Sequence, residues 1–446
     1  MEQPSSKRFI AIGSMLFALF FGAGNLIFPA AMGQSAGVNV WWAVLGFCVT
    51  GVGLPLLGII AVGYSGCRDL REVASRVHPL YGLFYTVVCY MAIGPCFAIP
   101  RTGTVSYEIA VRPFLSADPS AFALPIFLAF FLGISCWLAA SPSKLVDRIG
   151  KFLTPALLIT LAIMIVMSFA TPMGDFQAPG KAYDEPIKAA FQGVLDGYNT
   201  LDAIAALVFA TLIVNSVKEI GFTDPKAISS QVMKSGMLAG LLLALVYIFI
   251  AKIGAESVAA IGMQDTGAPV LAESAKVFFG SFGAYLLAAI VLLACITTAV
   301  GLLTCCAAFF MQLTGKFTYV QWVIGFTVIS YLIGLFGLKT IIVSTIPVLM
   351  FIYPLCVALI ALIFLHKFFG GRQCVYAWTM GFTFVMALVN GAETAGISMT
   401  GLEEVLKAYV PLHTYGMGWI PFAIVGFVIG LIWKVAVPAK AQNAAA

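Results

Sequence analysis

A four-residue interruption of an apolar stretch has the residue types that could bind a polar ligand inside a membrane. Gly22-Ala23-Gly24-Asn25 lies within FFGAGNLIFP. The glycines allow a helix to stop and restart, which frees carbonyl groups at the end of the first half and N–H groups at the start of the second. In lipid, such groups are tolerated only where they line a cavity. The N–H groups suit a carboxylate and the carbonyls suit a small cation or an ammonium, so we predict a site for a zwitterion and a cation. Close packing of small residues against another helix is the alternative interpretation.

A second interruption, DGYNTLD from Asp196 to Asp202, falls in a later apolar stretch. We expect Gly197 to supply the hinge, and the hydroxyls of Tyr198 and Thr200 to point at the substrate or its cation. A carboxylate at the bilayer centre costs at least about 2.5–3.5 kcal/mol, so an acid there is a functional residue by default. Asp202 could hold a cation, titrate, or fix the break by accepting backbone N–H bonds. A structural aspartate, hydrogen-bonded inside the helix bundle, is equally compatible with the sequence.

Two adjacent threonines lie near the centre of a third apolar stretch, ACITTAVGL, residues 294–302. Their hydroxyl oxygens could bind a monovalent cation, which needs several neutral oxygens. The same hydroxyls could instead bond back to the preceding helical turn. Because both interruptions and this pair fall within a few residues of the centres of their stretches, they share one depth, and we predict Thr297 and Thr298 as cation ligands.

A positively charged residue follows the third apolar stretch, in GPCFAIPRTGTVSYE, residues 94–108. Pro95 and Pro100 are expected to deform the end of that stretch, with Arg101 and Glu108 just outside it. Arg101 could close an outer gate by pairing with an acid, or it could lie at the level of the lipid headgroups.

The composition indicates a membrane protein. The chain has 446 residues, of which 61% are hydrophobic and 10% are charged, whereas soluble domains carry about 25% charged residues. The sequence contains no phosphate-binding loop, catalytic triad or Cys/His metal cluster, and no loop is large enough for a nucleotide-binding domain. We therefore expect neither an enzyme nor an ATP-driven pump, and we expect no organic cofactor and no nucleic-acid partner.

The predicted fold class is all-α and polytopic, with about twelve transmembrane helices surrounded by lipid. The expected spans are 9–33, 40–63, 80–100, 121–140, 149–171, 189–217, 231–251, 278–312, 319–337, 340–366, 375–392 and 418–437. The eighth is too long for one perpendicular crossing.

The two interrupted spans lie five helices apart, so the second copy of a five-helix repeat would enter the membrane in the opposite direction. This predicts a single transporter domain, residues 1–446. Its parts are a first repeat of helices 1–5 (9–171), an inverted second repeat of helices 6–10 (189–366) and two additional helices (375–437).

Lysine and arginine positions predict the orientation. With the N-terminus in the cytoplasm, 16 of the 24 fall on the inside, in agreement with the positive-inside rule. We therefore expect both termini in the cytoplasm. No oligomeric state is predicted.

Four stretches together resemble the bacterial branched-chain amino acid:cation symporter family, the transport system II carriers of BrnQ type. They are FALFFGAGNLIFP, GPCFAIPRTGTVSYE, DGYNTLDAIAALVF and ITTAVGL, in this order over almost the whole chain. The resemblance implies uptake of leucine, isoleucine and valine with a sodium ion across the bacterial inner membrane. The GxGN element followed by FP also resembles span one of the neurotransmitter:sodium symporters, which implies a LeuT-like 5+5 inverted repeat with helices 1 and 6 broken.

The resemblance also implies site residues by motif. The substrate carboxylate would bind at Ala23, Gly24 and Asn25. The sodium ligands would be three carbonyls and two hydroxyls: the carbonyls of Ala18, Phe21 and Ala294 and the hydroxyls of Thr297 and Thr298.

The expected function is therefore sodium-coupled symport of branched-chain amino acids by alternating access. Proton coupling through Asp202 is the alternative within the same class. A membrane sensor or channel would need a signalling domain or a continuous polar face, and the sequence has neither.

Overall fold

The described part of the chain is helical throughout its regular elements. A computed structural model of residues 1–446 describes residues 13, 16–17, 20–67, 69–115, 120–140, 158–159, 162–219 and 225–437. Within these ranges, eight segments are long and apolar enough to cross a membrane: Ala23–Ser65, Pro79–Phe114, Ala123–Ala140, Ser230–Ile261, Gly267–Thr314, Gly337–Leu365, Gln373–Thr394 and Trp419–Ala436. The expectation of an all-α polytopic membrane protein is confirmed.

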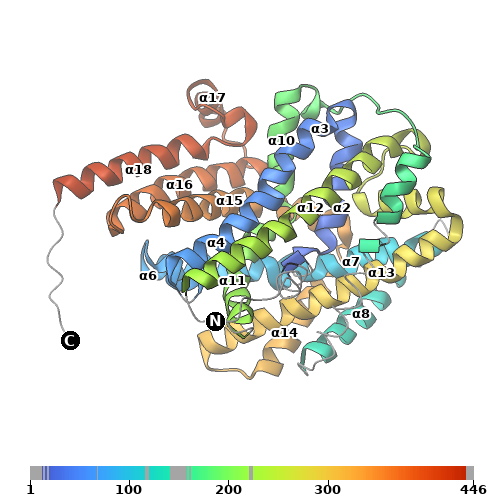
Figure 1. The fold of residues 1–446 in the computed structure, drawn as a ribbon, viewed down its shortest axis with the longest axis horizontal. Helices are drawn as coiled ribbons and strands as arrows, with labels where there is room; N and C mark the ends of the chain where they lie inside the picture. The colour runs from blue at the N-terminus through green and yellow to red at the C-terminus, as the bar shows by residue number, and fades with distance from the viewer. Residues whose placement is uncertain are drawn as a thin grey trace. The chain divides into compact units, whose positions relative to one another are not determined.

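The α-helices follow most predicted spans to within a few residues (Figure 1). Their bounds are α2 (Ala23–Ala36), α3 (Val40–Cys48), α4 (Leu54–Ser65), α5 (Leu70–Ser75), α6 (Pro79–Met91), α7 (Ala98–Ala110), α8 (Ala123–Ala140), α10 (Pro186–Tyr198), α11 (Asp202–Glu219), α12 (Pro225–Ile261), α13 (Gly267–Thr314), α14 (Tyr319–Gly334), α15 (Gly337–Leu365), α16 (Gln373–Thr394), α17 (Thr400–Tyr409) and α18 (Trp419–Ala436).

Two wide helical turns continue the second and third spans. The π-helix η2 (Val49–Gly53) joins α3 to α4, and the π-helix η3 (Ala92–Cys96) joins α6 to α7. Within η3 the backbone of Gly94 is non-helical and Pro95 follows, so a kink arises where a proline removes a helical hydrogen bond. The third span therefore continues to Ala110, whereas the sequence predicted that it would end at residue 100.

The helix that contains the overlong eighth span, α13, consists of two helical arms. Gly280, with φ +62° and ψ −155°, interrupts α13, and a positive φ of this kind is readily adopted only by glycine. The arm that follows the kink corresponds to the predicted span 278–312, and the arm that precedes it begins at Gly267.

The chain divides into two compact units. The first contains residues 1–56, 90–205 and 230–345, and the second contains residues 57–89, 206–229 and 346–446. Both predicted interruptions, the threonine pair and Arg101 belong to the first unit.

In the first unit, α10 and α3 run side by side with their backbones in contact (Figure 1). A Cβ atom added to Gly193 would overlap the carbonyl of Ala43, and one added to Gly46 would overlap the carbonyl of Ala190. Small residues allow helices to approach closely in lipid, where packing replaces the hydrophobic effect as the driving force.

The same arrangement joins α2 to α12. Gly33 of α2 lies against the carbonyl of Ala251, and Gly254 of α12 lies against the carbonyl of Ala30, so neither glycine has room for a side chain. The half-helix that follows the first interruption is thus held by backbone contact.

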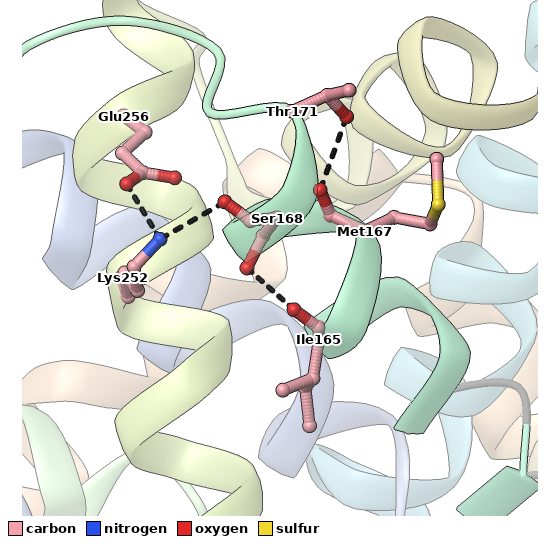
Figure 2. A network of polar contacts seen from close by, with 6 residues as sticks. All are labelled: Ile165, Met167, Ser168, Thr171, Lys252 and Glu256. Atoms are coloured by element: carbon pink, nitrogen blue, oxygen red, sulfur yellow. Dashed lines mark hydrogen bonds and ion pairs between the residues drawn. The ribbon is translucent and has the colours of Figure 1, made fainter.

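The lysine of a buried ion pair on α12 also contacts the helix of residues 162–170. Lys252 Nζ donates to Oε1 of Glu256, one turn along α12, at 2.6 Å and to the carbonyl oxygen of Ser168 at 3.2 Å. Figure 2 shows both contacts. The ammonium also lies 4.5 Å from the centre of the Phe169 ring. Because Lys252 and Glu256 are only 8% and 6% exposed, each charge depends on the other and on these neighbours.

The second unit contains α16 and α18, which pack along each other (Figure 1), and a polar cluster beyond the end of α15. Arg76 donates from Nη2 to the carbonyl of Ser65 at 2.7 Å, and its Nη1 lies 3.3 Å from Nδ1 of His366. His366 Nδ1 also lies 2.8 Å from the hydroxyl of Tyr376. Burial and the neighbouring Arg76 charge lower the pKa of His366.

Candidate functional site

The first interruption is a break in the helix. The N–H of Phe21 still donates to the carbonyl of Phe17, at 2.7 Å, but Gly22 is extended, with φ −118° and ψ −168°, and α2 begins at Ala23. The Gly22 N–H donates to Oδ1 of Asn25 at 3.0 Å. The N–H groups of Ala23 and Gly24 belong to the first turn of α2, where a helix offers donors without intrahelical partners.

The second interruption is also a break, and it falls between α10 and α11. Leu201 has φ +66°, so the chain turns sharply before α11 begins at Asp202. The Thr200 hydroxyl donates to the carbonyl of Gly197 at 2.9 Å and accepts from the Asp202 N–H at 3.3 Å. This hydroxyl is engaged within the break, and its role as a ligand for substrate stays a prediction.

Gly197 is not the hinge that we predicted. It lies inside the last turns of α10, and a Cβ atom there would overlap Oγ1 of Thr50 and come within 3.0 Å of the carbonyl of Phe47. Thr50 donates to the carbonyl of Val194 at 2.8 Å. Gly197 therefore permits close packing of α10 on η2, and the chain bends after Tyr198, whose side chain is only 2% exposed.

One hydrogen-bonded group connects the two breaks. Asn25 Nδ2 lies 2.5 Å from Oδ2 of Asp202 and 2.5 Å from the hydroxyl of Tyr247, and that hydroxyl lies 3.1 Å from the same Asp202 oxygen. All three side chains are almost fully buried, at 2%, 3% and 0% exposure. Asp202 thus accepts side-chain donors, where we had considered backbone N–H groups.

Tyr247 was not predicted as a site residue from the sequence. It lies in the middle of α12, among apolar residues, where a tyrosine has the pattern of an ordinary core aromatic. A buried tyrosine hydroxyl usually finds a partner, and this requirement is the signal that could have selected it.

Arg101 lies deeper than we expected. It occupies the first turns of α7 and is 4% exposed, so its placement at the headgroup level is wrong. Its Nη1 donates to the carbonyl of Asn199 at 2.7 Å, and Nη2 lies 3.5 Å from the carbonyl of Thr200. The guanidinium carbon lies 5.1 Å from the centre of the Phe28 ring. Arg101 therefore binds the carbonyls that the second break exposes.

The guanidinium of Arg101 also borders the first break. A Cβ atom added to Gly24 would come within 2.8 Å of Nη2, so the absence of a side chain at this position makes room for the cation. Arg101 consequently lies between the start of α2 and the end of α10.

Of the predicted cation ligands, Thr298 lies at the first break. A Cβ atom on Gly22 would be 3.4 Å from Cγ2 and 3.6 Å from Oγ1 of Thr298. The hydroxyls of Thr297 and Thr298 both donate to the carbonyl of Ala294, at 2.8 and 3.0 Å, which is the local bonding that we considered as the alternative. Phe21 is 3% exposed, and Ala18 lies outside the described residues.

The breaks are shielded from solvent. A cavity of about 580 Å³ opens elsewhere in the first unit, and its lining includes Glu108, Arg112, Asp265, Glu273 and Lys339 but none of the break residues. With Asn25, Thr200 and Asp202 at 2%, 4% and 3% exposure, a ligand can reach them only after the helices move.

The sequence as a whole decides the family. A family model described as "Branched-chain amino acid transport protein" matches residues 5–437. The chain belongs to this family. A member from Bacillus subtilis (strain 168), "Branched-chain amino acid permease BrnQ", is 44% identical over 434 residues, which cover 97% of this chain and 98% of the relative. "Branched-chain amino acid permease BraB" of the same organism is also 44% identical, over 98% of both chains.

Solved structures support the fold. Mhp1, a nucleobase-cation-symport-1 family transporter solved in a closed conformation with bromovinylhydantoin, matches with a TM-score of 0.61 at 15% identity, over 97% of this chain and 94% of that chain. MhsT in complex with L-phenylalanine matches with a TM-score of 0.58 at 16% identity, over 98% and 99%. The expected LeuT-like fold is confirmed, and the chain is a multi-pass membrane transporter of the branched-chain amino acid family.

Proposed function

We propose that this protein imports leucine, isoleucine and valine together with sodium by alternating access. The observation that carries the proposal is the Asn25–Asp202–Tyr247 group, which joins two helix breaks inside one unit. Paired breaks near the midplane are where secondary transporters of inverted-repeat design bind substrate and ion. The substrate class follows from the family and from relatives named as branched-chain amino acid permeases.

In the proposed site, the first turn of α2 supplies N–H donors at the positive end of a helix dipole, which suits the substrate carboxylate. Ala23 and Gly24 belong to this turn. The amino group would bind near Asp202, whose carboxylate is the acid at the second break. Because one methylene changes the binding free energy by only about 1–3 kcal/mol, the three aliphatic substrates are expected to share one pocket.

Sodium would bind beside the first break. Its proposed ligands are the carbonyls of Ala18, Phe21 and Ala294 and the hydroxyls of Thr297 and Thr298. The proximity of Thr298 to Gly22 supports this position, and unwound carbonyls coordinate sodium in other transporters with broken helices.

Alternating access is supported by the burial of the breaks, since substrate could enter only after a movement. The bacterial permeases that the chain resembles support the inner membrane as the location. The distribution of basic residues supports an orientation with both termini in the cytoplasm.

Uptake by the purified full-length protein in proteoliposomes tests the proposal. We expect labelled leucine to accumulate against its gradient with external sodium, and to lose accumulation when choline replaces sodium at fixed pH. Accumulation that continues unchanged in choline and requires an inward proton gradient would assign the coupling to protons, with Asp202 as the buried acid. Liposomes without protein give the background.

A further inference from the structure

We propose that Arg101 binds the substrate carboxylate, together with the first turn of α2, and thereby makes the carrier selective for molecules with a free carboxylate. This proposal rests on the proposed amino acid transport and names a ligand that neither the sequence motifs nor the family assigns. Its basis is the position of the guanidinium between the two breaks.

The first argument is electrostatic. The end of a helix that carries free carbonyls attracts a cation, whereas the start of a helix repels one. Arg101 donates to the carbonyls of Asn199 and Thr200, which follow the last turn of α10, and this contact is favourable. On its other side the guanidinium borders Gly24, in the first turn of α2. Two sources of positive potential therefore face each other at this point, and an anion between them would be stabilised by both.

The second argument is geometric. A guanidinium has five N–H donors in a planar fork that matches a carboxylate. The residue beside it has no Cβ, and adding one would bring it within 2.8 Å of Nη2 and 3.2 Å of Cζ. Gly24 therefore leaves room for the guanidinium beside the first turn of α2, where it can meet a carboxylate bound to that turn once the helices have moved. The ring of Phe28, one turn further along α2, has its centre 5.1 Å from Cζ and also borders the Cβ position of Gly24.

The third argument concerns the other end of the substrate. Asp202 lies at the same break and accepts hydrogen bonds from Asn25 and Tyr247. The carboxylate of Asp202 and the guanidinium of Arg101, both at this break, would bind the ammonium and the carboxylate of a zwitterion and so hold it in a fixed orientation. An amine without a carboxylate would lose one of the two contacts.

Competition with analogues tests the proposal. The inhibition of labelled leucine uptake is measured for leucine, for leucinol and for 3-methylbutylamine, of which the last two lack the carboxylate. In the wild type we expect the two analogues to inhibit about 10- to 100-fold less strongly than leucine, the range expected for hydrogen bonds to a charged group. In Arg101→Gln, unlabelled leucine should inhibit less strongly than in the wild type, whereas the inhibition by the two analogues should change little. The difference in inhibition between leucine and the analogues should therefore disappear.

Arg101→Lys keeps the charge without the fork and should retain part of the discrimination. Arg112→Gln removes an arginine of η4 (Arg112–Phe114), which lines the cavity of about 580 Å³ away from the breaks, and should leave the discrimination unchanged. A monodisperse profile in size-exclusion chromatography is required of each variant.

The outcomes separate the two proposals. A wild type that does not take up leucine overturns the transport proposal. A wild type that takes up leucine, with the same discrimination in Arg101→Gln as in the wild type, overturns only the role of Arg101. If neither Arg101 variant folds, the residue is structural and its role in selectivity is likewise overturned.

Discussion

Asn25 donates a hydrogen bond to Asp202, and this bond spans 177 residues of sequence. The same asparagine accepts from the N–H of Gly22 and so caps α2. One side chain thereby shapes the first break and fixes it to the second. A change at either residue is expected to affect both breaks.

Asp202→Asn should lower the rate of leucine uptake at least about tenfold, because a charge-assisted hydrogen bond contributes about 1.5–3 kcal/mol. The measurement is the initial rate in proteoliposomes at saturating sodium. Asp196→Asn is the matched control, since the Asp196 carboxylate accepts from Tyr183 and Gln192, which belong to neither break. Equal losses in the two variants would contradict a special role for Asp202.

Thr298→Ala should raise the sodium concentration for half-maximal uptake about tenfold, because one oxygen ligand is lost. Thr314→Ala is the control, since Thr314 lies on the same helix and makes the same kind of bond to the preceding turn, to Phe310. An unchanged sodium dependence in Thr298→Ala would falsify the ligand role.

Gly24→Ala should reduce leucine uptake about tenfold or more, because the added Cβ would displace the guanidinium of Arg101. Gly301→Ala adds the same methyl group on α13, where the new Cβ would meet no atom within 4 Å apart from its chain neighbours and the backbone of its own helix, and it should leave uptake unchanged. Normal uptake by Gly24→Ala would contradict this prediction, because it would show that transport does not depend on the close contact between Gly24 and Arg101.

Glu256→Gln should destabilise the protein by about 3–5 kcal/mol, since it leaves the buried Lys252 without its carboxylate. The midpoint of thermal unfolding in detergent measures the effect. Glu273→Gln breaks an exposed pair with Lys276, at 3.4 Å, and should cost about 1 kcal/mol or less. The double variant Lys252→Met/Glu256→Leu should recover most of the loss; a double variant as unstable as the single one would contradict the argument.

Acid should weaken the second unit through His366. Its pKa is lowered in the folded protein, so the unfolded chain binds the proton more readily. The neutral form stabilises the fold above the ordinary pKa of 6.5, and this contribution is lost as the pH falls below that value. We expect the wild type to lose more thermal stability between about pH 7.5 and 5.5 than His366→Asn. His78 is exposed, and His78→Asn should lose as much thermal stability over this pH range as the wild type. The prediction would be contradicted if the wild type and both variants gave the same pH profile.

The sequence predicted the helices and the positions of both breaks, because glycines, an asparagine and an aspartate in apolar stretches have few structural alternatives. It placed Arg101 too far out, since a span was assumed to end at its first charge, whereas this charge is compensated by carbonyls that come from 98 residues later. Gly197 was misread because the sequence does not distinguish a glycine that bends the chain from one that admits a neighbouring helix. Tyr247 acquires its meaning only from partners on other helices.

The glycine contacts of α2 with α12 and of α10 with α3 limit how a transport cycle can proceed. Helices whose backbones touch cannot slide past each other without separating, because no flexible side chain lies between them to rearrange. The half-helices α2 and α10 should therefore each travel with their partner as a rigid pair, so that opening and closing take place at the borders of these pairs. A crosslink within either pair is expected to leave the cycle intact, and one between the pairs to stop it.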